Sequence, residues 1–485
     1  KGPVGGCRVI LFGTGGVRGI MRDGEFDEEL IINVSRAVAL WMHEEKLDGV
    51  VIAYDTRRNS GYFAKLAAQT FTSCGIETYL FDAPTPTPLL SFAVRELRVG
   101  AGVVITASHN PPQYNGYKVY TGDGVQAVPS YTEKISSLMG KPFRVNKTAR
   151  MQFVSKEIEE RYVEKLVQLV KDHVEKRSRI VYSPLQGTGA RFVPKVLREL
   201  GCEVICVEQQ MEFDPDFSKV TSLNPEDEKA FDMVRRVCQE EKTRFGIATD
   251  PDCDRVGLIV DGKRLSGNQV GVLLTEMLRH RANPGSNLIK TFVTTDMVKP
   301  MCEELNLRVL ETPTGFKYIG HLIETRSKEP SFSYFLAFEE SCGYLMGDLV
   351  RDKDGVLGSA LIVGLCSKYD PIELLNSLYE RYGYHIEELI SMSFESPEQA
   401  KQKYEALKHN PPTRIADQEI VRIFDYENDP QMPNETLLLE TESVKIYVRP
   451  SGTEPKLKIY VKVVGCDEHE ARSILGSVRK AVMRL

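Results

Sequence analysis

A serine followed by a histidine comes directly after a short apolar stretch in the first quarter of the chain. Residues 106–111 have the sequence TASHNP, and the three residues before them are all apolar. We therefore expect Ser108 at the end of a strand, although a turn that ends in Asn-Pro fits the same letters. Lys118 follows shortly after in the sequence. A loop with a hydroxyl and a nearby ammonium group can handle a phosphoryl group, which makes Ser108 a candidate nucleophile.

Three aspartates alternate in a second loop, residues 250–255, which reads DPDCDR and lies between two apolar, strand-like runs. Carboxylate oxygens in this number suit Mg²⁺. An EF-hand calcium loop would require glycine in place of Arg255 and glutamate in place of Asp261, so that class of site is excluded. A solvated acidic turn is the other alternative, but carboxylates this close together usually need a cation. We therefore expect a metal site with Arg255 placed beside it to bind a phosphate oxygen. Its expected ligands are Asp250, Asp252 and Asp254.

Two further loops have the composition of phosphate sites. Residues 12–19 (FGTGGVRG) combine Arg18 with glycines, whose backbone N–H groups can approach an anion. This loop is not a dinucleotide fingerprint, because Arg18 occupies the place of the third glycine, and alone it reads more often as a plain turn. Residues 449–456 (RPSGTEPK) offer an arginine, two hydroxyls and free backbone donors. A hairpin turn is the alternative there, but we interpret the loop as a cradle for a phosphate group.

Weaker signals point to contacts with a sugar. Glu339 and Ser341 follow an apolar run, and their alternate positions would turn both side chains the same way, toward sugar hydroxyls. Residues 314–317 (TGFK) and 351–355 (RDKDG) are, in isolation, typical of a helix entry and a charged turn.

The composition excludes several classes of protein. The chain has 485 residues, 42% hydrophobic and 27% charged, and a formal net charge of −6. That charge argues against a broad nucleic-acid-binding surface, and no apolar run approaches the roughly 20 residues of a membrane helix. The 10 cysteines include no Cys-x-x-Cys pair, so neither a zinc ribbon nor a disulfide scaffold is indicated. The first six residues have no apolar core typical of a signal peptide, and we expect a cytoplasmic protein.

Short apolar runs that alternate with helical patterns indicate an α/β protein of several domains. The length alone predicts about four of them. Charged stretches near residues 171–179, 279–286 and 380–388 mark the expected junctions. We therefore expect three similar α/β domains and a last domain of different pattern. Their predicted limits are residues 1–176, 177–284, 285–388 and 389–485.

Taken together, the loops resemble the α-D-phosphohexomutase family in wording and in order: TASHNP, DPDCDR, EES and RPSGTEPK. The match spans nearly the whole chain. The sequences of three segments, FEESCGYLMGD, RDKDG and PTGFK, are most similar to those of bacterial phosphoglucomutases and of the phosphoglucomutase/phosphopentomutase branch. The resemblance implies four domains around a central cleft. Three are α/β domains with mixed sheets and the last is α+β, and they contribute the serine, metal, sugar and phosphate loops in turn.

The resemblance also implies a reaction and a role for each loop. It implies interconversion of glucose 1-phosphate and glucose 6-phosphate through a phosphoserine, here Ser108, and a glucose 1,6-bisphosphate intermediate, with Mg²⁺ as cofactor. Ser108 would bind Mg²⁺ together with Asp250, Asp252 and Asp254. The resemblance further implies that Arg18, His109 and Lys118 assist proton and phosphoryl transfer. The residues expected to hold the substrate are Arg255, Thr314, Gly315, Glu339, Ser341, Lys353, Arg449, Ser451, Gly452 and Thr453.

Alternatives remain for the substrate and for the reaction. Mannose phosphates and pentose phosphates are the other substrates that the resemblance allows. The competing functions are a metal-dependent phosphatase, a sugar-bisphosphate synthase and a phosphosugar-binding protein without turnover; an intact serine, metal triad and lysine argue against a mere binder. The expected partner is a small phosphosugar rather than a nucleic acid or a membrane. The oligomeric state, monomer or dimer, stays open.

Overall fold

The computed structural model describes residues 16–142, 149–175, 177–451 and 455–484. The chain divides into two compact units. The first contains the residues up to Val270 together with Phe316–Phe332 and Ser341–Tyr369. The second contains Gly271–Gly315, Ser333–Glu340 and the residues from Asp370 onward.

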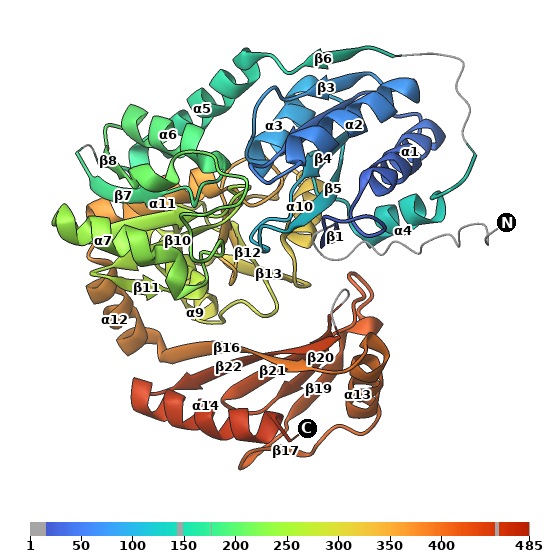
Figure 1. Cartoon of the computed structure of the whole chain (residues 1–485). Coiled ribbons are helices and arrows are strands. Elements are labelled where there is room, and N and C mark those ends of the chain that lie inside the picture. Colours follow the sequence, from blue (N-terminus) through green and yellow to red (C-terminus); the bar gives the residue numbers. More distant parts are fainter. Residues whose placement is uncertain (1–15, 143–148, 176, 452–454, 485) are drawn as a thin grey trace. The chain divides into compact units, whose positions relative to one another are not determined.

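The first unit begins with a six-stranded mixed sheet (Figure 1). Four of its strands run parallel, and the two at one edge pair antiparallel to their neighbours. The two central parallel strands are buried along almost their whole length, as their continuous apolar sequences lead us to expect. In spatial order the strands are β1 (Val17–Ile20), β5 (Tyr114–Thr121), β4 (Ala101–Ile105), β2 (Val50–Tyr54), β3 (Thr78–Leu80) and β6 (Met151–Phe153).

Helices cover both faces of that sheet. One helix leads from β2 outward to β3 and the next leads from β3 back to β4, so right-handed crossovers place the two on opposite faces. The first described helix, α1 (Glu28–Glu44), starts after Asp27. The Asp27 carboxylate accepts a hydrogen bond from the backbone N–H of Leu30 at 2.9 Å and so caps the helix. The helices of this region are α1 (Glu28–Glu44), α2 (Ser60–Ser73), α3 (Thr87–Leu97), α4 (Pro129–Ser137) and α5 (Lys156–Val170).

The first unit also contains a second mixed sheet, which has five strands. Parallel strands form one half of it, and a hairpin followed by a short edge strand forms the other. The order is β11 (Lys263–Leu265), β10 (Val256–Val260), β9 (Phe245–Thr249), β7 (Arg179–Ser183) and β8 (Glu203–Cys206). Other elements of the unit are α6 (Val193–Glu199), α7 (Asp232–Glu240), α10 (Phe316–Arg326), β15 (Gly343–Leu345) and α11 (Gly355–Lys368).

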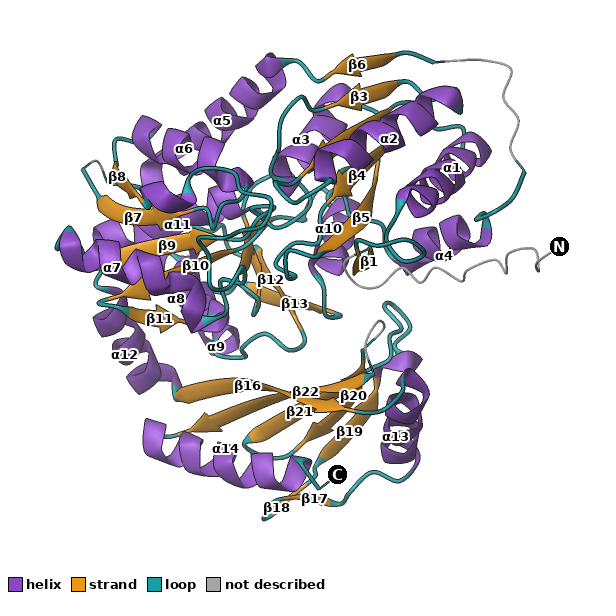
Figure 2. Cartoon of the chain, in the orientation of Figure 1, coloured by secondary structure: helices purple, strands orange, loops and turns teal. Residues whose placement is uncertain are grey.

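The second unit combines a parallel and an antiparallel sheet. Three parallel strands, β13 (Arg308–Thr312), β12 (Asn287–Thr291) and β14 (Tyr334–Glu339), lie side by side. The antiparallel sheet has the order β16 (Tyr384–Ser393), β22 (Lys456–Gly465), β21 (Val444–Pro450), β20 (Leu437–Glu440) and β19 (Arg422–Asp425). Helices α13 (Pro397–His409) and α14 (Glu468–Val482) pack on it, as Figure 2 shows. The remaining elements are α9 (Val298–Glu303), α12 (Pro371–Tyr382), the small pair β17 (Arg414–Ile415) and β18 (Gln418–Glu419), and α8 (Gly267–Arg279), which begins in the first unit.

A mostly buried group of charges joins the two sheets of the second unit. Asp296 lies 2.9 Å from Lys290 of β12, 2.8 Å from Lys445 of β21 and 3.0 Å from Lys462 of β22. Burial alone would raise the pKa of Asp296, but these lysines hold it far below its usual range. Because one carboxylate is shared by strands of both sheets, the end of β12 is fixed to the antiparallel sheet.

The observed architecture confirms the predicted α/β class with mixed sheets. The antiparallel sheet with helices near the C-terminus also agrees with the different pattern expected there. The four predicted domain limits stay a prediction. Among the described residues, no helix has both the length and the apolar character that crossing a lipid bilayer requires.

Candidate active site

Ser108 lies in the loop between β4 and β5, shortly after the end of β4 at Ile105. Its side chain is buried, and its backbone φ of +53° lies in the left-handed region, which a residue other than glycine seldom adopts. The Ser108 hydroxyl donates a hydrogen bond to Oδ2 of Asp250 at 2.9 Å. Its Oγ is also 3.3 Å from Nδ1 of His109. The strained turn thus presents the hydroxyl to the aspartate loop.

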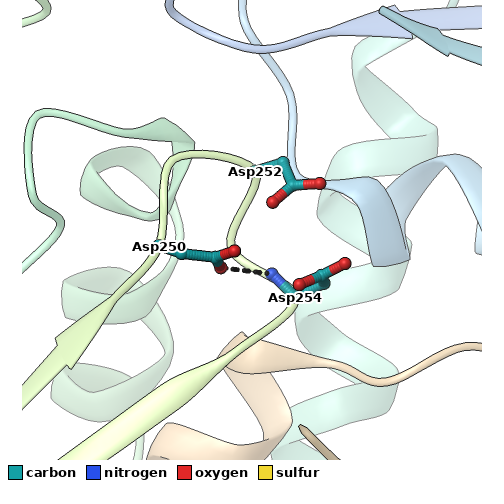
Figure 3. A group of neighbouring side chains, drawn as sticks. All are labelled: Asp250, Asp252 and Asp254. Atoms are coloured by element: carbon teal, nitrogen blue, oxygen red, sulfur yellow. Dashed lines mark hydrogen bonds between the residues drawn. The ribbon is translucent and has the colours of Figure 1, made fainter. Parts of the chain in front are cut away.

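The three aspartates of the second loop converge in the first unit. This loop joins β9 to β10, and Figure 3 shows the side chains of Asp250, Asp252 and Asp254 turned toward one another. One oxygen of each lies within 4.8 Å of those of the others, and all three residues are buried. The N–H of Asp254 donates to Oδ1 of Asp250 at 3.1 Å, which tightens the loop.

The carboxylates of this triad fit a divalent cation. Among the described residues, Oδ1 of Asp252 and Oδ1 of Asp254 are buried without a hydrogen-bond partner. Burial and the neighbouring Asp254 and Asp252 carboxylates raise the pKa of Asp250 well above its usual range. Buried, mutually repelling oxygens are stable as a group when a cation lies among them. A small, hard ion such as Mg²⁺ matches this donor set.

Two lysines bind the other oxygens of Asp252 and Asp254. Lys118 Nζ is 2.8 Å from Oδ2 of Asp252 and 3.3 Å from Oδ2 of Asp254. Lys353 Nζ is 3.1 Å from the same oxygen of Asp254. Burial alone would lower the pKa of Lys118, but the two aspartates raise it above its usual value, so its ammonium stays charged. Asp252 and Asp254 therefore each have one oxygen on a lysine and one left for a cation.

Further positive charge surrounds the serine loop. Arg18 on β1 donates to Oδ1 of Asn110 at 2.9 Å, and its buried Nε has no hydrogen-bond partner within the part of the chain that the structure describes. Arg255 is paired with Glu226 at 2.6 Å. Burial lowers the pKa of His109 well below its usual value, and Arg255 and Arg18 lower it further. His109 is therefore neutral near pH 7.

The other predicted substrate residues are divided between the two units. Ser341 and Lys353 belong to the first unit with Ser108, whereas Thr314, Gly315, Glu339, Arg449 and Ser451 belong to the second. Glu339 ends β14 and is buried. Arg449 lies near the end of β21, and Ser451 follows that strand. Gly452 and Thr453 lie outside the described residues.

Sequence reasoning missed several residues that shape this site. Thr87 donates from its hydroxyl to Oδ2 of Asp252 at 2.9 Å, and Glu226 holds Arg255. Asp55 and Arg57, directly after β2, contact the serine loop. Their signal was available: a charged pair follows an apolar strand, and the ends of neighbouring parallel strands meet at one edge of a sheet, where ligands bind.

The fold and the site together define an enzyme for phosphoryl transfer, with a buried serine, a carboxylate triad and surrounding cations. Family models of phosphoglucomutase/phosphomannomutase α/β/α domains I, II and III match residues 9–144, 160–263 and 266–382. The chain belongs to the phosphoglucomutase/phosphomannomutase family, the α-D-phosphohexomutases. It is accordingly an isomerase that works as an intramolecular phosphotransferase.

Similar proteins cover almost the whole chain. A phosphoglucomutase of Staphylococcus haemolyticus is 33% identical and aligns over 94% of this chain and 90% of its own length. A phosphoglucomutase of Staphylococcus aureus is 32% identical and aligns over 94% of this chain and 89% of its own length. Two solved structures share the fold. A phosphoglucomutase/phosphomannomutase family protein of Burkholderia thailandensis has a TM-score of 0.79 at 20% identity, covering 98% of both chains. The open form of Paramecium parafusin, a phosphoglucomutase, has a TM-score of 0.74 at 16% sequence identity. The match covers 100% of this chain and 95% of the parafusin chain.

Proposed function

We propose that this enzyme interconverts α-D-glucose 1-phosphate and glucose 6-phosphate, with Ser108 as the phosphate carrier and glucose 1,6-bisphosphate as the intermediate. The observation that carries the proposal is the buried Ser108 hydroxyl, bonded to Asp250 within a triad whose other members bind Lys118 and Lys353. The relatives with 33% and 32% identity are phosphoglucomutases, which favours glucose over mannose and pentose phosphates.

The proposed metal is Mg²⁺, held by Asp250, Asp252, Asp254 and a phosphate oxygen on Ser108. When bound, it supplies positive charge that stabilises the in-line transfer of a phosphoryl group. The support for this site is the pair of unpartnered buried carboxylate oxygens, which match the preference of Mg²⁺ for oxygen ligands.

The chain's own groups would balance the proton and the charge. The bond from phosphorus to Ser108 Oγ breaks as the bond to a sugar hydroxyl forms, and the proton of that hydroxyl must leave. His109, neutral and 3.3 Å from Ser108 Oγ, is the proposed group to accept the proton and later return it. Lys118 and Arg18 remain charged and stabilise the negative charge spread over the transferring oxygens.

The remaining predicted residues would hold the sugar and the phosphate that does not react. We assign the transferred group to Arg255 and the distal phosphate to Arg449, Ser451, Gly452 and Thr453. The proposed sugar contacts are Thr314, Gly315, Glu339, Ser341 and Lys353. The four predicted domains, with limits at residues 176, 284 and 388, would each contribute one of these loops. We also retain a cytoplasmic location as part of the proposal, to be tested by cell fractionation.

One assay tests this function against its competitors. Purified enzyme with Mg²⁺ is given glucose 1-phosphate, with and without catalytic glucose 1,6-bisphosphate. We expect glucose 6-phosphate in stoichiometric yield, at a rate that the bisphosphate increases. Release of inorganic phosphate would favour a phosphatase, and accumulation of bisphosphate once an external phosphoryl donor is added to the same mixture would favour a synthase. Binding of the phosphosugar without any product would reduce the protein to a binder.

Replacing Glu339 with alanine tests the proposed sugar contact. Loss of a buried group that binds sugar hydroxyls is expected to lower kcat/KM for glucose 1-phosphate by about 100-fold, and to change the ratio between glucose and mannose phosphates. The next residue offers a matched control. Glu340 accepts hydrogen bonds from the hydroxyls of Thr291 and Thr294 at 3.0 Å each, so Glu340→Gln should affect stability more than substrate choice. Equal kcat/KM ratios for all sugars in Glu339→Ala and wild type would refute the role of Glu339.

A further inference from the structure

A buried arginine outside the predicted site holds the backbone of the serine loop. Arg57 comes just after β2, and its side chain has no exposed surface. Its two terminal nitrogens donate to four carbonyl oxygens, three of them in the loop between β4 and β5 and one on the first residue of β5. A guanidinium has five N–H donors in a rigid plane, and here a single guanidinium binds four backbone carbonyl groups at once. The carbonyl groups belong to Ser108, Asn110, Pro111 and Tyr114.

The guanidinium is itself held on its other sides. Arg57 Nε donates to Oδ2 of Asp55 at 3.1 Å, and the backbone N–H of Arg57 donates to Oδ1 at 3.0 Å. Asp55 is as fully buried as its partner. The ring of Phe217 lies with its centroid 5.4 Å from Arg57 Cζ. Contacts along one edge and beside an aromatic ring leave the guanidinium little freedom to move.

The same network reaches Ser108 through its backbone N–H. The hydroxyl of Thr106 accepts that N–H at 2.8 Å and donates to Oδ2 of Asp55 at 2.6 Å. Ser108 is therefore held at its N–H by Thr106 and at its carbonyl by Arg57, and both holders are bound to Asp55. The left-handed conformation of Ser108 is unfavourable by itself, so it depends on such surrounding contacts.

We propose that Arg57 is a positioning residue for phosphoryl transfer, which aims the Ser108 hydroxyl at Asp250 by fixing the carbonyl groups of its loop. The inference rests on the proposed function, because it concerns the reaction of Ser108. It also has an electrostatic part. A carbonyl oxygen that turned toward a phosphate dianion would repel it, and Arg57 engages four of them. A reacting group misplaced by about 1 Å can lose roughly 100-fold in rate.

The test compares two buried arginines. Arg57→Lys keeps the positive charge but not the planar fork, so it cannot bind the four carbonyl groups together. Arg279→Lys is the matched control, because Arg279 is equally buried and bonds to Met301 and Glu304 in the second unit. The measurements are kcat and KM for glucose 1-phosphate, the rate at which Ser108 gains a phosphoryl group from glucose 1,6-bisphosphate, and hydrogen exchange of the amides of residues 106–114.

For Arg57→Lys we expect kcat and the phosphorylation rate to fall about 100-fold while KM stays within about threefold, together with faster exchange of the loop amides. Arg279→Lys should keep wild-type kcat and loop exchange. Wild-type kcat in Arg57→Lys would overturn the inference. So would a loss of kcat no larger than the unfolded fraction measured by circular dichroism, with loop exchange unchanged.

A second variant covers the case in which Arg57→Lys fails to fold. Thr106→Val has nearly the same volume and removes only the hydroxyl between Ser108 and Asp55; we expect kcat to fall about tenfold with faster exchange at Ser108. A wild-type kcat together with wild-type exchange at Ser108 in Thr106→Val would overturn the inference. If the wild-type enzyme shows no mutase activity, the proposed function fails by itself. Loop exchange in the variants then still decides whether Arg57 and Thr106 hold the loop.

Discussion

Replacing Ser108 with alanine is expected to lower kcat for glucose 1-phosphate by at least about 10⁴-fold, because the proposed reaction passes every phosphoryl group through this oxygen. No neighbouring group can take its place. Lys118 is a charged ammonium bound to Asp252 and Asp254, and His109 is needed for the proton. The variant should still bind sugar phosphates, since the proposed binding groups are unchanged.

The measurement pairs turnover with mass spectrometry of the intact protein. Wild-type enzyme incubated with glucose 1,6-bisphosphate should gain one phosphoryl group, and Ser108→Ala should gain none. Ser35→Ala is a matched control, because Ser35 is also buried but bonds to Tyr117 within the core. Its kcat and phosphorylation should equal those of the wild type. Near-normal turnover in Ser108→Ala, or phosphorylation of another residue in it, would refute the carrier role.

The parts of this site that are predictable from sequence lie within short segments. Ser108 could be placed at a strand end because the apolar run before it is continuous, and β4 ends just before the TASHNP loop. The triad was visible because Asp250, Asp252 and Asp254 alternate in one turn between two strands. In both cases the residues that define the geometry are neighbours in the chain, so a local pattern contains the information.

The parts that escaped prediction depend on contacts between distant segments. Arg57 reaches carbonyl groups 51 to 57 residues away, and nothing in its own surroundings specifies that loop as its partner. Lys353 was expected near the substrate through family resemblance alone. Its bond to Asp254 depends on how the residues before α11 pack against the metal loop, where the Gly355 N–H donates to the carbonyl of Cys253 at 3.0 Å. Such pairings follow from the packing of whole elements, which local periodicity does not determine.

Replacing Asp252 with asparagine tests the metal site. The variant keeps the shape of the side chain but removes one negative charge from the proposed Mg²⁺ ligands. We expect the Mg²⁺ concentration for half-maximal activity to rise about 100-fold, and kcat to fall by about the same factor even at saturation. Wild-type enzyme stripped of metal with a chelator should lose its activity and recover it with added Mg²⁺. Calorimetric titration with Mg²⁺ alone measures the same change without turnover.

The difficulty with Asp252→Asn is that Asp252 also binds Lys118, and removing one partner of a buried ion pair can destabilise a protein by about 3 to 5 kcal/mol. Asp354→Asn controls for the loss of a buried carboxylate charge outside the proposed metal site. Asp354 is equally buried and caps α11, but it lies outside the proposed metal site, and burial raises its pKa to about 6. Its folded pKa is above the unfolded value, so the buried charge of its carboxylate destabilises the fold at pH 7, and a neutral asparagine should be tolerated. If Asp252→Asn weakens Mg²⁺ binding while Asp354→Asn does not, the effect belongs to the metal site. Unchanged Mg²⁺ binding in Asp252→Asn would remove Asp252 from the proposed ligands.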